Sequence, residues 1–344
     1  MSRKNPLVSP TGEGLPKTGE APIDLVVTRG NAEESLHRVH ALVIKSGGAV
    51  EAKWGNSDLS LFPRSAIKII QAVPIVQKKL HEKYALDSAD LALACASHHG
   101  EAYHTERVSA WLQKLSLQEK DLECGVHAPY DEETFHKMLR AGGAPSQIHN
   151  NCSGKHCGLM TQALELDRSV AGYTNFDHPV QEELRVVQER FFSIKMQKWG
   201  IDGCGIPTYS IPLLNLGLGL AKIANPKELN AADADAVKIL QESILENPTY
   251  IGGRRSFCTE VIQKTKGRVI AKVGAEGVYG AWIPEQGVGI ALKCEDGGTR
   301  AAKAVLYKIL ESFGMSFENE VGSVKRWTGD LVGHIYCRCA AHSS

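Results

Sequence analysis

Short apolar runs near both ends of the chain set those regions apart from the middle. The runs are rich in Val, Ile and Leu and are bounded by Gly, Pro or charged residues, which is typical of strands. The strands predicted in this way are residues 25–27, 40–44, 49–54, 268–272, 277–283 and 287–293.

Between the two groups of strands, apolar residues recur every three or four positions, which is the period of an amphipathic helix. A last helix with the same period follows the final strand. The predicted helices are residues 66–84, 89–97, 101–115, 132–139, 158–166, 179–192, 231–245 and 299–313.

Strands at both ends with helices between them predict a single α/β domain, residues 23–334. Its antiparallel sheet, with flanking helices, is expected to be assembled from residues 23–62 and 254–314, because short turns join neighbouring strands. A helical subdomain of about residues 64–250 is inserted into that sheet. The tails predicted on either side are residues 1–22 and 335–344.

Composition excludes several functional classes. The 39 basic residues are balanced by 39 acidic ones, so the chain lacks the basic surface that nucleic acid requires. No apolar run reaches the length of a membrane span, and the first residues carry Pro, Gly and charge where a secretory signal has an apolar stretch. Nine cysteines, without secretory features, indicate reduced thiols. We expect a cytoplasmic protein that binds neither nucleic acid nor membranes.

Ser65 and Lys68 form the first candidate reactive pair, three residues apart on one face of a starting helix. A Ser attacks only when a neighbour takes its proton, and Lys can do so only if burial or a nearby cation keeps it neutral. This short motif taken alone favours an N-capping Ser beside a solvated Lys.

Lys272, followed two residues later by Gly274, ends one of the late strands. S-x-x-K on an early helix and K-x-G on a late strand is the order found in penicillin-recognising serine enzymes, which predicts the same fold here. Ser97, at the end of an intervening helix, is placed where a third motif of those enzymes contributes a serine. Two Ser and two Lys are therefore expected to converge, and their like charges help to keep one Lys neutral.

A run of polar and small residues opens one of the predicted helices and is dense in donors and metal ligands. It is consistent with an anion or carboxylate site at a helix N-terminus. It is also consistent with a metal site that uses Cys152 with Lys155, His156 or Cys157, to which Cys258 adds a distant candidate ligand. The third interpretation is a capped helix start with incidental thiols.

With these motifs in place, the sequence resembles the asparaginase II family of L-asparaginases, the rhizobial type. The resemblance runs from about residue 25 to residue 333. The segments that carry it are Arg38-Val39-His40-Ala41, Arg64-Ser65-x-x-Lys68, Cys95-Ala96-Ser97-His98, Asn150-Asn151-Cys152-Ser153-Gly154-Lys155-His156, Asp202-Gly203-Cys204-Gly205-Ile206-Pro207, Cys258-Thr259 and Lys272-Val273-Gly274-Ala275.

The resemblance implies a serine β-lactamase and glutaminase-like fold, a homodimer, and an active site beside a zinc ion. Its implied catalytic residues are two Ser-Lys tandems, Ser65 with Lys68 and Ser97 with Lys272. The implied zinc ligands are Cys152, Lys155 and Cys258. The implied substrate-binding residues are Arg64, His98, Asn151 and Asp202, of which Asp202 holds the α-amino group.

The function expected from the resemblance is hydrolysis of L-asparagine to L-aspartate and ammonia. Ser65 attacks the side-chain amide, Lys68 takes its proton, and Ser97 with Lys272 relays protons to the leaving group. A glutaminase or a β-lactamase-like serine amidohydrolase is the alternative. A non-catalytic zinc-binding module is the second alternative, which would keep the cysteines and have no need of Ser65.

Overall fold

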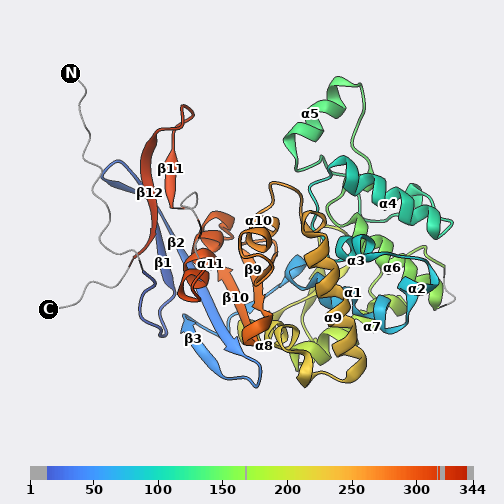
Figure 1. Cartoon of the computed structure of the whole chain (residues 1–344), viewed down its shortest axis with the longest axis horizontal. Helices are drawn as coiled ribbons and strands as arrows, with labels where there is room; N and C mark the ends of the chain where they lie inside the picture. Colours follow the sequence, from blue (N-terminus) through green and yellow to red (C-terminus); the bar gives the residue numbers. More distant parts are fainter. Residues whose placement is uncertain (1–13, 167–168, 316, 318–321, 339–344) are drawn as a thin grey trace.

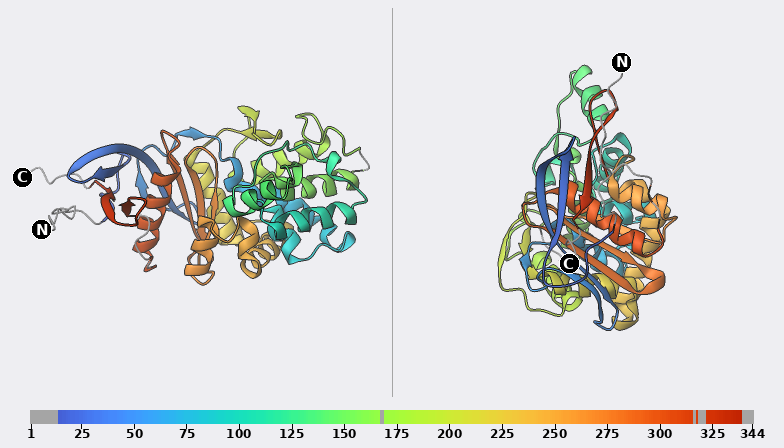
Figure 2. Two further views of the ribbon diagram at one scale, coloured as in Figure 1. Left: turned by 90° about the horizontal axis from the view of Figure 1, so that it is seen from above. Right: turned by 90° about the vertical axis from the view of Figure 1, so that its left-hand side faces the viewer.

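The computed structural model describes residues 14–166, 169–315, 317 and 322–338. The molecule is elongated, with an antiparallel sheet at one end and most of the helices at the other (Figures 1 and 2). This arrangement confirms the predicted α/β class, with helices flanking the sheet and a helical part inserted into it.

The strands come from both ends of the chain. The main sheet has the order β11-β12-β1-β2-β10-β9-β8, with β3 also paired to β2, and each of its pairs is antiparallel. The strands are β1 (Ile23–Arg29), β2 (Ala32–Lys45), β3 (Val50–Trp54), β4 (Ser60–Leu61), β5 (Trp199–Ile201), β6 (Pro207–Tyr209), β7 (Ile211–Pro212), β8 (Ile270–Val273), β9 (Val278–Ile283), β10 (Val288–Cys294), β11 (Ser323–Lys325) and β12 (Leu331–Cys337).

Most helices fall close to the predicted segments, and α7 has the predicted bounds, but α6 begins five residues before its predicted start and α8 and α10 were not predicted. The helices are α1 (Lys68–Gln77), α2 (Leu80–Lys83), α3 (Ser88–Ala94), α4 (Ala102–Lys114), α5 (Glu132–Arg140), α6 (Ser153–Glu165), α7 (Pro179–Phe192), α8 (Leu213–Ala224), α9 (Ala231–Glu246), α10 (Phe257–Lys264) and α11 (Thr299–Ser312). The helix predicted at 66–84 is divided, because Lys79 adopts a left-handed φ of 53° between α1 and α2.

Helix α8 covers one face of the sheet, although the apolar pattern did not predict it. Its Gly217 lets the helix approach β2 closely, since a Cβ there would lie 2.9 Å from Leu42 and 3.1 Å from Ile44. Residues 39–44 of β2 are all buried, so the sheet is covered on both faces. Helix α11 also packs against β2, β9 and β10.

The ends of the described chain are more ordered than the predicted tails. Strand β12 pairs with β1 through Cys337, so the boundary expected at residue 334 falls inside a strand. Near the other end, Gly19 exchanges backbone hydrogen bonds with Lys53 and Gly55, and the indole of Trp54 donates to the Pro16 carbonyl at 2.8 Å. Both terminal segments thus extend the sheet region, because their backbone groups find partners on its outer strands.

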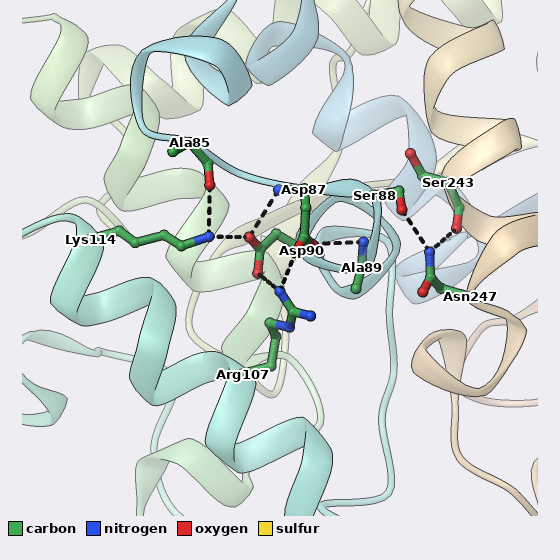
Figure 3. A network of polar contacts seen from close by, with 9 residues as sticks. All are labelled: Ala85, Asp87, Ser88, Ala89, Asp90, Arg107, Lys114, Ser243 and Asn247. Atoms are coloured by element: carbon green, nitrogen blue, oxygen red, sulfur yellow. Dashed lines mark hydrogen bonds and ion pairs between the residues drawn. The ribbon is translucent and has the colours of Figure 1, made fainter.

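Helix α3 ends just before the site residue Ser97, and buried charged groups hold its N-terminal half in place (Figure 3). Asp87 and Asp90 form a capping box at its start. The fully buried Asp90 carboxylate accepts hydrogen bonds from Lys114 at 2.7 Å and from Arg107 at 3.3 Å, both on α4. A buried charge held by two cations fixes the direction of the helix, and the chain leaves α3 towards Ser97.

Candidate active site

Ser65 lies in a strained segment at the start of the helical part. It belongs to the 3₁₀ turn η1 (Arg64–Ile67), which runs directly into α1. Arg64 has a φ of 51°, in the left-handed region that costs a residue with a Cβ on the order of 1–3 kcal/mol. Such strain gathers at functional sites. Ser65 itself is half-buried and lines a cavity of about 480 Å³.

The two predicted tandems meet at the hydroxyl of Ser97. Lys272 Nζ lies 2.7 Å from Ser97 Oγ, and Lys68 Nζ lies 3.2 Å from the same oxygen. Both lysines are almost fully buried, and Ser97 lines the cavity. Two amines at one buried hydroxyl form a chain along which protons can pass.

The structure departs from the expected Ser65–Lys68 contact. Within the described chain, no hydrogen bond joins these two side chains. The Lys68 ammonium instead finds three acceptors on neighbouring segments: the Ala96 carbonyl, Ser97 Oγ and, at 3.1 Å, Cys152 Sγ. Three acceptors satisfy all three N–H donors of a buried ammonium, which one hydroxyl cannot do.

Lys272 is the lysine of the pair that loses its proton more readily. Burial lowers its pKa to about 7, and the neighbouring charge of Lys68 acts in the same direction. A neutral amine has one lone pair, so Lys272 can accept the Ser97 proton while it donates to the Val273 carbonyl at 3.1 Å. The like-charge effect expected from the sequence acts on Lys272, whose pKa the neighbouring Lys68 lowers.

Arg64 and Asp202 supply one positive and one negative group on the cavity wall. Arg64 Nε and Nη2 lie 2.8 and 2.6 Å from the same carboxylate oxygen, Asp202 Oδ1. Burial acts to raise the pKa of Asp202, but the hydrogen bond from Arg64 and the charge of Lys155 outweigh it and lower the pKa. Asp202 is thus an anion facing the cavity, as binding of an α-ammonium requires.

Of the two other predicted substrate-binding residues, only Asn151 lines the cavity. The ring of His98 is fully buried behind it, between Ser153 Oγ at 2.8 Å and the Gly100 amide at 3.2 Å. His98 is therefore not on the cavity wall in this structure, because both ring nitrogens have partners inside the protein. Its neighbour His99 lines the cavity instead, and nothing in two adjacent histidines distinguishes them by sequence.

The thiol cluster includes a residue to which the sequence analysis gave no role. Lys155 Nζ lies 2.9 Å from Cys204 Sγ, and the Cys152 thiol is hydrogen-bonded to the same sulfur. The Cys152 bond, with help from Lys155 and against burial, holds the pKa of Cys204 well below its usual range. The same bond, together with burial, raises the pKa of Cys152 to about 12. Cys204 is therefore the more acidic of the two thiols.

Cys258, the third expected ligand, does not join this cluster. Its sulfur accepts the Val273 backbone N–H at 3.3 Å. Among the described residues, the one group of three His, Cys, Asp or Glu side chains close enough to share an ion is His37, Cys294 and Asp296, and none of these lines the cavity. Cys152, Lys155 and Cys204 are thus the donors that the fold brings together.

Two thiols and an amine fit zinc, which prefers sulfur and nitrogen donors. Burial acts to lower the pKa of Lys155, but the charge of the Cys204 thiolate outweighs it and raises the pKa. A metal would therefore have to displace a proton from this amine. The two other metal-ligand candidates from the sequence have different partners. His156 Nδ1 bonds to the Tyr173 hydroxyl at 2.6 Å, and Cys157 Sγ faces the Val108 carbonyl.

The L-asparaginase II family model matches residues 25–334. The chain belongs to the L-asparaginase II family. It is therefore an amidohydrolase that acts on a small molecule. No curated protein matches the sequence.

Solved structures similar to this L-asparaginase II family member include a probable glutaminase from Bacillus subtilis complexed with 6-diazo-5-oxo-L-norleucine. It is 14% identical, with a TM-score of 0.38 over 81% of this chain and 85% of that one. An ancestral class A β-lactamase is 13% identical, with a TM-score of 0.39 over 80% of this chain and 95% of that one. In the described part of the chain, no helix is long and apolar enough to cross a bilayer.

Proposed function

We propose that the protein hydrolyses L-asparagine to L-aspartate and ammonia, with Ser65 as the nucleophile. The observation that supports this most is the pair of buried lysines at Ser97 Oγ, beside a cavity that Ser65 lines. A chain of two amines and one hydroxyl can take a proton from a nucleophile and return it to a leaving group.

The proton path uses the hydrogen bonds at Ser97 for its first two steps, and its last step requires the Lys68 amine to turn towards Ser65. Neutral Lys272 takes the proton of Ser97, the Lys68 ammonium replaces it, and the Lys68 amine formed in this way takes the proton of Ser65. Ser65 Oγ then bonds to the amide carbon. The negative carbonyl oxygen needs a donor, and the Ser65 backbone N–H in the first turn of η1 can supply one.

The second half of the reaction returns the proton. The C–N bond breaks as the lysine chain protonates the nitrogen, so ammonia leaves and an ester of Ser65 remains. Water then attacks the ester carbon and passes a proton to the same chain. The bond from this carbon to Ser65 Oγ breaks, the chain returns the proton to Ser65, and L-aspartate is released. One water is consumed for each amide hydrolysed, and both lysines regain their starting protonation states.

Charged and polar groups on the cavity wall orient the amino-acid substrate. The Asp202 carboxylate suits the α-ammonium group, and Asn151 offers an amide for polar contact. We also propose that Cys152, Lys155 and Cys204 hold a zinc ion, which would supply positive charge at the edge of the cavity and fix the position of polar groups there. A homodimer and a cytoplasmic location stay predictions.

The test is ammonia release from L-asparagine and from L-glutamine, with hydrolysis of a penicillin measured in parallel. We expect the highest kcat/KM for L-asparagine. A higher value for glutamine, or opening of the penicillin ring, would assign the protein to the alternative amidohydrolases. If the protein binds zinc but hydrolyses none of the three compounds, the non-catalytic zinc-binding module is the remaining interpretation.

The position of the acyl group tests the nucleophile separately. A diazo-ketone analogue of asparagine traps the attacking hydroxyl, and peptide mass spectrometry then locates the label. We expect it on Ser65. A label on Ser97 would make Ser97 the nucleophile and Lys272 its direct base.

A further inference from the structure

If the proposed function holds, the substrate is an amino-acid amide and brings an α-carboxylate into the cavity. The question that rests on that function is which cation binds this carboxylate. Three permanent cations line the cavity: Arg64, Arg255 and Lys303. Two nitrogens of Arg64 already bind the Asp202 carboxylate. The substrate carboxylate therefore needs one of the other two.

Arg255 and Lys303 differ in their partners. Arg255 forms an exposed ion pair with Glu133 at 3.4 Å. Within the described ranges of the chain, no carboxylate lies within 4.0 Å of Lys303 Nζ. A half-buried ammonium without a counter-ion, on the wall of a site for zwitterions, is suited to an anionic ligand group.

The position of Lys303 is fixed without its charge being neutralised. It lies on α11 one turn after Thr299, so both side chains point from the same helix face towards the cavity that they line. Its Nζ is held above the ring of Phe257, 5.4 Å from the ring centre. A cation–π contact restrains an ammonium and leaves its N–H donors available for a carboxylate.

Lys303 also lies near the reacting groups. Burial lowers the pKa of His99, and although Glu101 and Asp131 act against this, the charge of Lys303 adds to it. His99 and Lys303 both line the cavity. Lys272 cannot take the carboxylate itself, because it must stay neutral to act as the base.

We propose that Lys303, with the hydroxyl of Thr299 beside it, binds the α-carboxylate of the amino-acid substrate. Asp202 and Lys303 then hold the two charges of the zwitterion from two different elements of the fold. The reactive amide is left between them, at the Ser65 hydroxyl.

The test compares L-asparagine with 3-aminopropanamide, which is asparagine without the α-carboxylate. Removing a charged hydrogen bond at a partly buried site weakens binding by about 10- to 100-fold. In Lys303→Gln we expect KM for L-asparagine to rise by about that factor, with kcat within about threefold of wild type. The kcat/KM for 3-aminopropanamide should not change.

Lys308→Gln is the matched control, because it removes the same charge from the same helix at a surface ion pair with Glu311. It should alter neither substrate. Equal effects of Lys303→Gln on both substrates, or a KM for L-asparagine within about twofold of wild type, would overturn the proposal. So would the expected pattern appearing in Arg255→Gln instead.

A binding measurement separates this inference from the proposed function. Calorimetry compares L-aspartate with β-alanine, which is aspartate without the α-carboxylate, and needs no turnover. Lys303→Gln should weaken L-aspartate binding and leave β-alanine binding unchanged. If Lys303→Gln weakens binding of L-aspartate only, but wild type releases no ammonia from L-asparagine, the proposed function fails and the carboxylate site stands. If the variant binds L-aspartate as wild type does, the carboxylate site fails.

Discussion

Burial of Lys272 should make the protein less stable at neutral pH than a variant that lacks the amine. Its pKa is lowered from 10.5 to about 7 by burial, and the charge of Lys68 adds to this. At 1.36 kcal/mol for each pKa unit, the protonated amine destabilises the fold by about 5 kcal/mol. In Lys272→Met, the hydrogen bonds to Ser97 and Val273 are lost, at about 1 kcal/mol each. The inactive variant should thus be about 3 kcal/mol more stable than wild type at pH 7 and below.

The sign of the pH dependence follows from proton binding. Between pH 7 and 10.5 the unfolded chain binds a proton at Lys272 that the folded protein does not bind. The free energy of unfolding of wild type therefore rises with pH in this window. The folding equilibrium constant increases by up to a factor of ten for each pH unit. The difference between the two proteins should shrink above pH 7 and vanish near pH 9, where about 2 kcal/mol of the burial penalty remains.

The assay is urea unfolding of wild type and Lys272→Met at pH 7, 8 and 9. Lys293→Met serves as the control, since the Lys293 ammonium bonds to the Glu276 carbonyl at an exposed site. In parallel, kcat/KM of wild type should rise with pH to a plateau above about 7, as the Lys272 amine loses its proton. A stability difference that stays constant from pH 7 to 9 would show that folded Lys272 keeps its proton, and the lysine base would have to be abandoned.

Three further changes test the other parts of the site. Ser65→Ala should abolish ammonia release with the fold intact, and activity within about tenfold of wild type would mean a different nucleophile. Cys204→Ala should lose zinc, measured by elemental analysis, whereas Cys258→Ala should keep it; the reverse result would restore Cys258 as the ligand. Asp202→Asn should raise KM for L-asparagine by about tenfold or more, but it should leave hydrolysis of succinamate, which has no α-amino group, unchanged. An equal loss on both compounds would place Asp202 in a structural role.

Segments whose structure depends on local pattern were predicted well. Helix α7 has the predicted bounds, because Pro179 suits a first helical turn and His178 caps it with its side chain. Strand β12 was missed because its pattern is poor without its partner. Gly333, which counts against a strand by propensity, is required there, since a Cβ would lie 1.9 Å from the Thr28 carbonyl of β1.

The site was predicted in its residue types and only partly in its contacts. The sequence resemblance named both Ser-Lys tandems, and the fold brings Lys68 and Lys272 to one hydroxyl. It did not predict that Cys204 would meet Lys155, because no sequence rule relates residues so far apart. That contact arises when the chain turns back between β5 and β6 and carries the sulfur to the start of α6.

The glycine of the K-x-G motif explains why distant parts of the chain form one site. A Cβ on Gly274 would lie 2.6 Å from the Pro63 carbonyl, so the end of β8 touches the segment that carries Ser65. Any side chain there would have to separate the two segments. The hydrogen bond of Lys272 to Ser97 measures 2.7 Å, and a displacement of about 1 Å takes such a bond out of range. The absence of a side chain at Gly274 therefore keeps Ser65 close to the hydrogen-bonded group of Ser97, Lys68 and Lys272.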